Sequence, residues 1–257
     1  FGLCLVDDTS WQKILLLVGP PRAGKGVVCR TLTHTIGRAN VANPTLSGLA
    51  TEFGLWPLIG RSVAILTDAH LSRRGDDVRA LETIKAISGE DDVTVNRKNL
   101  PLLTNVRLRV RFIVTVNELP HFNDPSGALA ARLLICPFEN SWAGKEDRTI
   151  ERRIQGEAPG VLNWSLGGLH RLRTRGTFTI PAKSEEIARS YRRLTSPAAA
   201  FLEDCCETGA PGLNVDVEEL FHAFCEWAEA NGHAKVSKNT LGEKLRAADP
   251  RIQIRRK

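Results

Sequence analysis

The sequence predicts an α/β fold, with a parallel central sheet followed by a small C-terminal domain of helical or winged-helix-like character. Three observations lead to this prediction. Four short, continuously apolar runs, typical of buried parallel strands, alternate with helical patterns: residues 14–18, 62–67, 111–116 and 133–138. The first run passes through a glycine-rich turn into a helical pattern. The last 70 or so residues carry mainly helical patterns, closed by an alternating stretch at 251–257.

The most specific motif lies between the first apolar run and the helix after it. It reads GxxxxGK in the strand–loop–helix context of a phosphate-binding P-loop, and comprises Gly19, Pro20, Pro21, Arg22, Ala23, Gly24, Lys25, Gly26 and Val27. Glycines let successive backbone N–H groups converge on one point, and the helix N-terminus favours an anion. Lys25 adds a full positive charge for the β- and γ-phosphates. We therefore expect nucleotide binding here; the alternative is a glycine-rich turn with a solvated lysine.

Polar residues follow two further apolar runs. Asp68 comes after the second run and Asn117 after the third. Ligands of parallel sheets lie at the carboxyl ends of the strands, so both residues should meet the glycine loop in one crevice. There Asp68 is expected to hold Mg²⁺, and Asn117 to contact the γ-phosphate or the attacking water. The alternative for each is a turn or capping role.

The group that activates water is left open by the sequence. Many P-loop enzymes carry a second acid next to the metal ligand, but Ala69 follows Asp68. The candidates are Asp68 itself, or one of three acids elsewhere: Glu90, Asp91 and Glu118. Position 26, where a hydroxyl normally binds Mg²⁺, is a glycine, and Val27 follows it. The sequence therefore leaves open whether the bound nucleotide is hydrolysed.

Two basic features lie outside the loop. Arg132 stands between an alanine-rich helical pattern and the fourth apolar run, where it could reach the γ-phosphate of a neighbouring subunit; the alternative is a surface salt bridge. Arg97 and Lys98 occupy the polar tip of a predicted hairpin over residues 93–100 and could grip the phosphates of a single strand. The alternative is a solvated pair.

Composition sets broad limits. Of the 257 residues, 42% are hydrophobic and 25% are charged, as in soluble globular proteins, and the net charge of +6 is compatible with nucleic acid. No apolar run approaches the roughly 20 residues that span a bilayer.

The six cysteines form no CxxC pair, and Cys29 and Cys136 are expected in the core. Phe1 to Val6 does not read as a signal peptide. The absence of methionine leads us to expect a fragment of a longer protein.

Several blocks together resemble the superfamily 3 helicase domain of phage and plasmid primases. They are DTSWQKILLLVGPPRAGKG (8–26), PTLSGLATEFGLWPLIGR (44–61), AILTDAHL (64–71), SGEDDVTVNRK (88–98), RFIVTVNELP (111–120) and SGALAARLLICPFENSW (126–142). Further similarity lies in residues 159–172 and 194–206. The resemblance covers nearly the whole chain.

This resemblance implies an AAA+-like ATPase, with ATP and Mg²⁺ as cofactors, that translocates on single-stranded DNA. It implies a homo-oligomeric, usually hexameric, ring, an upstream primase domain, no membrane and a cytoplasmic location in a bacterial or phage-infected cell. The expected domains are an ATPase core over 1–180 and a C-terminal domain over 181–257. Matching positions carry the roles of Walker A (Gly19–Gly26), Walker B acid (Asp68), DNA-contacting hairpin (Arg97, Lys98), motif C asparagine (Asn117) and arginine finger (Arg132).

The function expected is thus an ATP-dependent replicative DNA helicase domain. Two alternatives belong to other classes. The first is an ATP-gated DNA- or origin-binding module with weak or no turnover, since positions 26 and 27 lack a hydroxyl. The second is a small-molecule P-loop kinase, which the basic charge and the lack of an evident acceptor-binding lid disfavour.

Overall fold

The computed structural model describes residues 1–67, 75–119, 128–208, 212–249 and 251–253. The chain forms two compact units, of which the first comprises 1–122 and 132–185 and the second 123–131 and 186–257. The boundary between the units lies after residue 185, within helix α7 (Ala182–Thr195). The boundary expected from the sequence, after residue 180, lies just before this helix. In the part of the chain described, we find no helix that is both long and apolar enough to cross a membrane.

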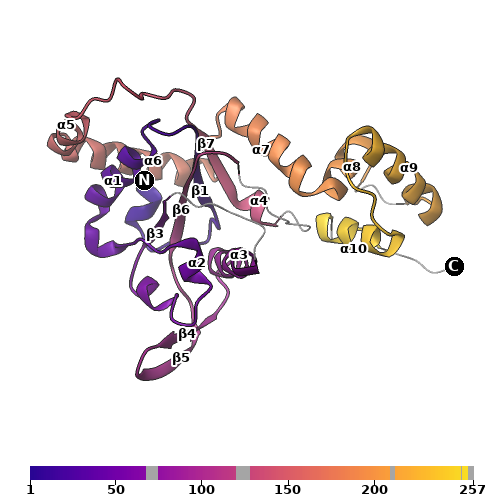
Figure 1. Ribbon diagram of the computed structural model, residues 1–257, viewed down its shortest axis with the longest axis horizontal. Coiled ribbons are helices and arrows are strands. Elements are labelled where there is room, and N and C mark those ends of the chain that lie inside the picture. The colour runs from indigo at the N-terminus through magenta and orange to yellow at the C-terminus, as the bar shows by residue number, and fades with distance from the viewer. Residues whose placement is uncertain (68–74, 120–127, 209–211, 250, 254–257) are drawn as a thin grey trace. The chain divides into compact units, whose positions relative to one another are not determined.

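A five-stranded sheet forms the centre of the first unit (Figure 1). Its strand order is β2-β3-β6-β1-β7 and every neighbouring pair is parallel, which confirms the predicted parallel sheet. Every residue of β3 and β6 is buried, so both faces of these strands are covered, which explains their largely apolar sequences. The bounds are β1 Ile14–Val18, β2 Val41–Ala42, β3 Val63–Leu66, β6 Arg111–Val116 and β7 Leu133–Pro137.

The helix that follows the glycine loop covers part of this sheet. Buried residues of α1, namely Cys29, Leu32 and Ile36, pack with Leu17 of β1 and Ile113 of β6 in one apolar cluster. Burial raises the pKa of the Cys29 thiol to about 11, so this cysteine acts as a small apolar residue, as predicted. The α-helices of this unit, apart from α7, are α1 Lys25–Ile36, α2 Leu46–Leu49, α3 Gly75–Ser88, α5 Ile150–Gly156 and α6 Ala158–Arg175, and its 3₁₀ helices are η1 Gly2–Leu5, η2 Arg38–Asn40 and η3 Trp56–Leu58. The short helix α4 (Ala128–Arg132) belongs to the second unit except for its last residue, Arg132.

The expectation that Cys136 lies in the core is wrong. Cys136 is exposed, because β7 is an edge strand of the sheet and has a neighbour on one side only.

The short helix α2 is capped by Thr45, whose Oγ1 accepts a hydrogen bond from the Gly48 N–H at 3.0 Å. Ser47 lies inside the helix.

A two-stranded antiparallel hairpin projects from the body of the first unit (Figure 1). It consists of β4 (Val93–Arg97) and β5 (Leu100–Val106), so the predicted hairpin is present but its second strand is longer than expected. Lys98 and Asn99 form the tip. Asn99 has φ 58°, a left-handed conformation that asparagine tolerates in tight turns.

The second unit has its own apolar core. Helices α8 (Pro197–Cys205), α9 (Val217–Ala230) and α10 (Lys238–Ala248) contribute its buried residues. Phe201 and Phe224 meet edge to face, with centroids 5.4 Å apart. The winged-helix assignment stays a prediction: residues 251–253 form no strand, and 254–257 lie outside the described residues.

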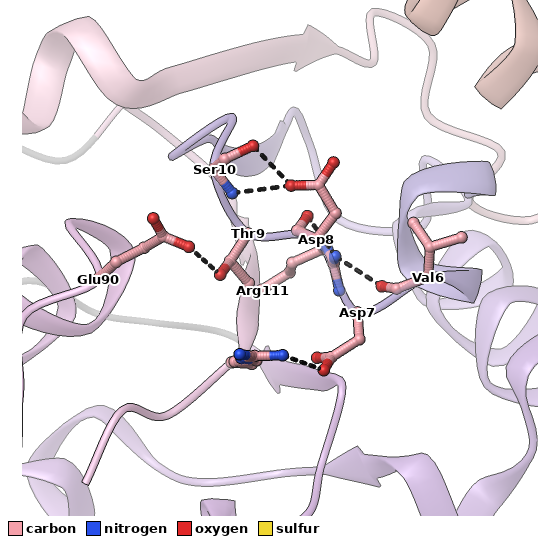
Figure 2. Close-up of polar contacts among 8 residues, drawn as sticks. Val6, Asp7, Asp8, Thr9, Ser10, Glu90 and Arg111 are labelled. Carbon is pink, nitrogen blue, oxygen red and sulfur yellow. Dashed lines mark hydrogen bonds and ion pairs between the residues drawn. The ribbon is translucent and has the colours of Figure 1, made fainter.

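A buried arginine fastens the N-terminal segment to the sheet. Arg111, the first residue of β6, is only 7% exposed, and its Nη2 donates to the carbonyl oxygens of Val6 (2.7 Å) and Asp8 (Figure 2). Its Nε and Nη1 are buried without a hydrogen-bond partner among the described residues. Burial lowers the pKa of this guanidinium. Ser10 donates to the Asp8 carboxylate through its hydroxyl and its N–H, which lowers the pKa of Asp8.

Arg111→Ala is expected to destabilise the first unit by about 2 kcal/mol, because two charge-assisted hydrogen bonds are lost and relief of the buried charge offsets part of that loss. Arg109→Ala is the matched control. Arg109 forms an exposed ion pair with Asp7, so its loss should leave the unfolding midpoint nearly unchanged. Urea unfolding of both variants measures the difference, and equal midpoints would exclude the anchoring role of Arg111.

Candidate functional site

The glycine loop contains two residues with positive φ close to the start of α1. Gly24 has φ 98° at the N-cap of α1, and Arg22 has φ 61°. A Cβ atom added at Gly24 would meet no atom within 4 Å, so the space beside the helix N-terminus is open. Gly19 is tightly enclosed, since a Cβ there would lie 2.1 Å from the Phe138 carbonyl oxygen. The loop is therefore open at its helical end and packed where it leaves β1.

Lys25 is buried, although it carries a charge, with 7% of its surface exposed. Its Nζ donates to the Gly19 carbonyl oxygen, to the Pro20 carbonyl oxygen at 2.9 Å and to Asn117 Oδ1 at 3.1 Å. Asn117 directly follows β6, which lies beside β1. The structure thus brings together two residues that lie 92 positions apart, at the carboxyl ends of adjacent parallel strands.

The predicted metal ligand, Asp68, lies outside the described residues. The preceding strand, β3, ends at Leu66 and lies beside β6. Among the described residues, no group of three or more His, Cys, Asp or Glu side chains is arranged to hold a metal ion. Space for a hydroxyl exists at position 26: a Cβ on Gly26 would meet only the Arg30 guanidinium, 3.0 Å away at the end of a flexible side chain.

The glycine loop fits a phosphate group better than it fits a metal ion. The open space at Gly24, the N-terminus of a 12-residue helix and the Lys25 ammonium suit a phosphate group. The fit to Mg²⁺ is weaker, because neither Gly26 nor Val27 carries an oxygen ligand in its side chain. The described loop therefore has the chemistry of a phosphate site, and a metal ion would take its protein ligands from elsewhere.

Arg132 is held by its own chain. Its Nη1 donates to the Lys85 carbonyl oxygen and to Ser88 Oγ (3.1 Å), at the C-terminal end of α3. Gly89 leaves room for the guanidinium, since a Cβ there would lie 3.0 Å from Nη2. Helix carbonyls at a C-terminus attract a cation, which stabilises this position. Arg132 is half-buried, and its side-chain hydrogen bonds within the described part of the chain lead to α3 and not to the glycine loop.

The candidate acids lie in different surroundings. Glu90 accepts a hydrogen bond from the Thr9 hydroxyl (Figure 2), and Gln12 Nε2 donates to the neighbouring Gly89 carbonyl at 3.0 Å. Asp91 and Glu118 are exposed. Sequence reasoning did not foresee these bonds between the N-terminal segment and the end of α3, because no local pattern marks a pair some 80 residues apart.

The two basic residues of the hairpin differ in their environment. Arg97 Nε and Nη2 donate to the Pro101 carbonyl oxygen across the hairpin, at 3.2 and 2.9 Å. Lys98 is exposed at the tip, beside the exposed side chains of Leu100 and Leu102. Arg97 therefore braces the hairpin, and Lys98 is the better placed of the two to meet a ligand.

Comparison with known proteins adds information on the fold. The profile of a protein family of unknown function, DUF5906, matches residues 17–132, from β1 to the end of α4. A search of curated proteins finds no match. The apo structure of the NrS-1 C-terminal region superposes with a TM-score of 0.57 at 16% identity, covering 92% of this chain and 54% of that chain. A second apo form gives 0.51 at 16%, covering 76% and 46%.

A structure of the JCV helicase bound to an acetamide compound gives a TM-score of 0.41 at 17% identity, with 88% of this chain and 58% of that chain covered. The likeness to the NrS-1 region is one of fold. The chain spans about half the length of the NrS-1 structures that it matches.

Proposed function

We propose that this chain is the motor domain of an ATP-dependent DNA helicase. The observation that carries the proposal is the hydrogen bond of 3.1 Å between Lys25 Nζ and Asn117 Oδ1. It places a lysine at a helix N-terminus next to a polar group at the end of the adjacent parallel strand. The fold shared with the NrS-1 C-terminal region supports the proposal, as does the resemblance of the sequence blocks to superfamily 3 helicases.

ATP binds with its phosphates over residues 19–26. Lys25 exchanges its carbonyl partners for phosphate oxygens, while Asn117 orients the terminal phosphate or the attacking water. Asp68 would hold Mg²⁺, and the ion would supply positive charge to the phosphates when bound. The ATPase core occupies 1–180, and within the C-terminal domain the tail from about residue 198 to residue 257 contacts duplex DNA or a partner.

Arg132 acts on the nucleotide of a neighbouring subunit in a homo-oligomeric, hexameric ring. To do so, its guanidinium exchanges Lys85 O and Ser88 Oγ for phosphate oxygens as charge develops in the transition state. Each site is then completed by two subunits. A primase domain is the partner that the resemblance to this family implies for such a motor.

The second candidate is an ATP-gated DNA- or origin-binding module with weak or no turnover. Two observations favour it: positions 26 and 27 lack a hydroxyl, and Arg132 is engaged by its own chain. Phosphate release with and without single-stranded DNA separates the candidates. A helicase motor releases phosphate faster when DNA is present, whereas the gated module binds ATP and DNA with no such increase.

Lys98→Ala is expected to weaken binding of an oligothymidylate and to reduce the slope of log K against log salt by about 0.7 for each phosphate that the lysine neutralises. The reason is that Lys98 is the exposed cation at the hairpin tip. Lys145→Ala is the control, because Lys145 is also exposed in the first unit but lies outside the hairpin. Fluorescence anisotropy over a salt series measures both, and identical slopes in the two variants would remove the hairpin from the DNA site.

A further inference from the structure

The segment between β7 and α5 crosses the glycine loop. It leaves β7 at Phe138, whose N–H donates to the Val18 carbonyl oxygen at 2.7 Å. Its backbone passes so close to Gly19 that a side chain there is excluded. The closeness explains why the first position of the loop is a glycine, and it brings the following residues against the outer part of the loop.

Two hydrogen bonds and an ion pair then fasten this segment to the loop. Ser141 Oγ donates to the Pro21 carbonyl oxygen at 2.8 Å, and the Trp142 N–H donates to the Arg22 carbonyl oxygen at 3.1 Å. Arg22 Nε lies 3.8 Å from Glu146 Oε1. Trp142 is therefore held one hydrogen bond away from the loop that we assign to phosphates.

Trp142 is 54% exposed, so a large part of its indole is open to solvent although its backbone is held against the loop. Trp164 is also exposed but meets Phe1 edge to face, with centroids 5.6 Å apart. Among the described residues, no aromatic ring is paired with the Trp142 indole. A large exposed π-face beside a phosphate loop is suited to stacking on a flat ligand group.

The strand order indicates on which side of β1 the nucleoside end of a bound nucleotide lies. Lys25 meets Asn117 on the β6 side of β1, whereas the segment that carries Trp142 follows β7, on the other side of β1. A nucleoside triphosphate with its terminal phosphates at Lys25 and Asn117 thus extends its nucleoside end toward β7. The base then arrives on the side where Trp142 lies.

We propose that the base of the bound purine nucleotide stacks on the Trp142 indole, an assignment that rests on the proposed function. Stacking is tolerant of the base because every base has a π-face, and a purine offers the larger one. Trp142 therefore adds affinity for the nucleoside half, and ATP and GTP bind with similar affinity.

The test compares ATP with inorganic tripolyphosphate, which has the phosphates but no base. Trp142→Ala in the full chain should weaken ATP binding about 5- to 150-fold, the effect of losing one base–aromatic stack, and leave tripolyphosphate binding unchanged. Trp142→Phe should restore most of the ATP affinity. Trp56→Ala is the control, because Trp56 is a 43% exposed tryptophan in η3, which is not part of the segment between β7 and α5. Calorimetric titration measures the affinities, and thermal unfolding checks that each variant is folded.

The outcomes separate this inference from the proposed function. Unchanged ATP binding in Trp142→Ala, or an equal loss of ATP and tripolyphosphate, would overturn the stacking assignment and leave the phosphate site intact. Failure of the wild-type chain to bind either ligand would overturn the proposed function, and the stacking assignment with it. A loss confined to ATP, restored by phenylalanine, supports both.

Discussion

Lys25→Ala is expected to lower the affinity for ATP by about two orders of magnitude, the equivalent of roughly 3 kcal/mol for charge-assisted hydrogen bonds to phosphate. The ammonium is buried, and the Gly19 and Pro20 carbonyl oxygens and Asn117 Oδ1 already hold it between the ends of β1 and β6. A phosphate that enters the loop therefore finds the charge in place, and little further ordering of the lysine is needed. Nucleotide titration followed by phosphate release measures both binding and turnover.

The control for this variant is Lys235→Ala in the second unit, which removes the same side chain from an exposed ion pair with Glu229. The same substitution at Lys25 also leaves the Gly19 and Pro20 carbonyls and Asn117 Oδ1 without their lysine donor. Thermal unfolding must therefore be recorded alongside binding. Retention of ATP affinity in a folded Lys25→Ala protein would remove the nucleotide site from the glycine loop, and with it the proposed function.

Arg132→Ala is expected to reduce turnover about 10³-fold, the lower range for an arginine finger, while ATP binding stays unchanged. The guanidinium acts only as charge develops on the transferred phosphate, so its loss affects the transition state more than the bound nucleotide. In the structure the same group ties the start of β7 to the end of α3. Ser88→Ala is the matched control, because it removes one partner of this tie and keeps the arginine.

Mixing two inactive variants distinguishes action within a subunit from action between subunits. Protomers with Arg132→Ala keep Lys25, and protomers with Lys25→Ala keep Arg132. A shared site regains turnover when both are mixed in one assembly, since some interfaces then hold both groups. No recovery on mixing, together with an equal loss in Ser88→Ala, would assign Arg132 to packing of α3 alone.

Much of the central sheet was predictable from short patterns. Strands β1, β3, β6 and β7 are largely apolar along their whole length, and such runs leave few alternatives in a chain that also shows helical periodicity. The glycine loop was equally visible, because left-handed φ at Gly24 and close approach at Gly19 both require the residue found there.

Other features depend on interactions between distant segments. Nothing near Arg111 indicates that it binds carbonyls of residues 6 and 8, and nothing near Arg132 indicates that it bonds to the end of α3. Cys136 has apolar neighbours in the sequence, as a core residue would, yet it is exposed because β7 is an edge strand of the sheet. In each case the environment of the side chain depends on a segment that is distant in the sequence. The residues next to it in the chain do not carry this information.

The glycine loop was evident in the sequence, because its pattern is local: a strand, a glycine-rich turn, a lysine and a helix start follow one another directly along the chain. The surroundings of that loop came from the fold. Parallel pairing of β1 with β6 brought Asn117 to Lys25, and pairing of β1 with β7 brought Trp142 to Arg22. These partners lie far apart along the chain, so they were set by sheet topology and not by sequence spacing.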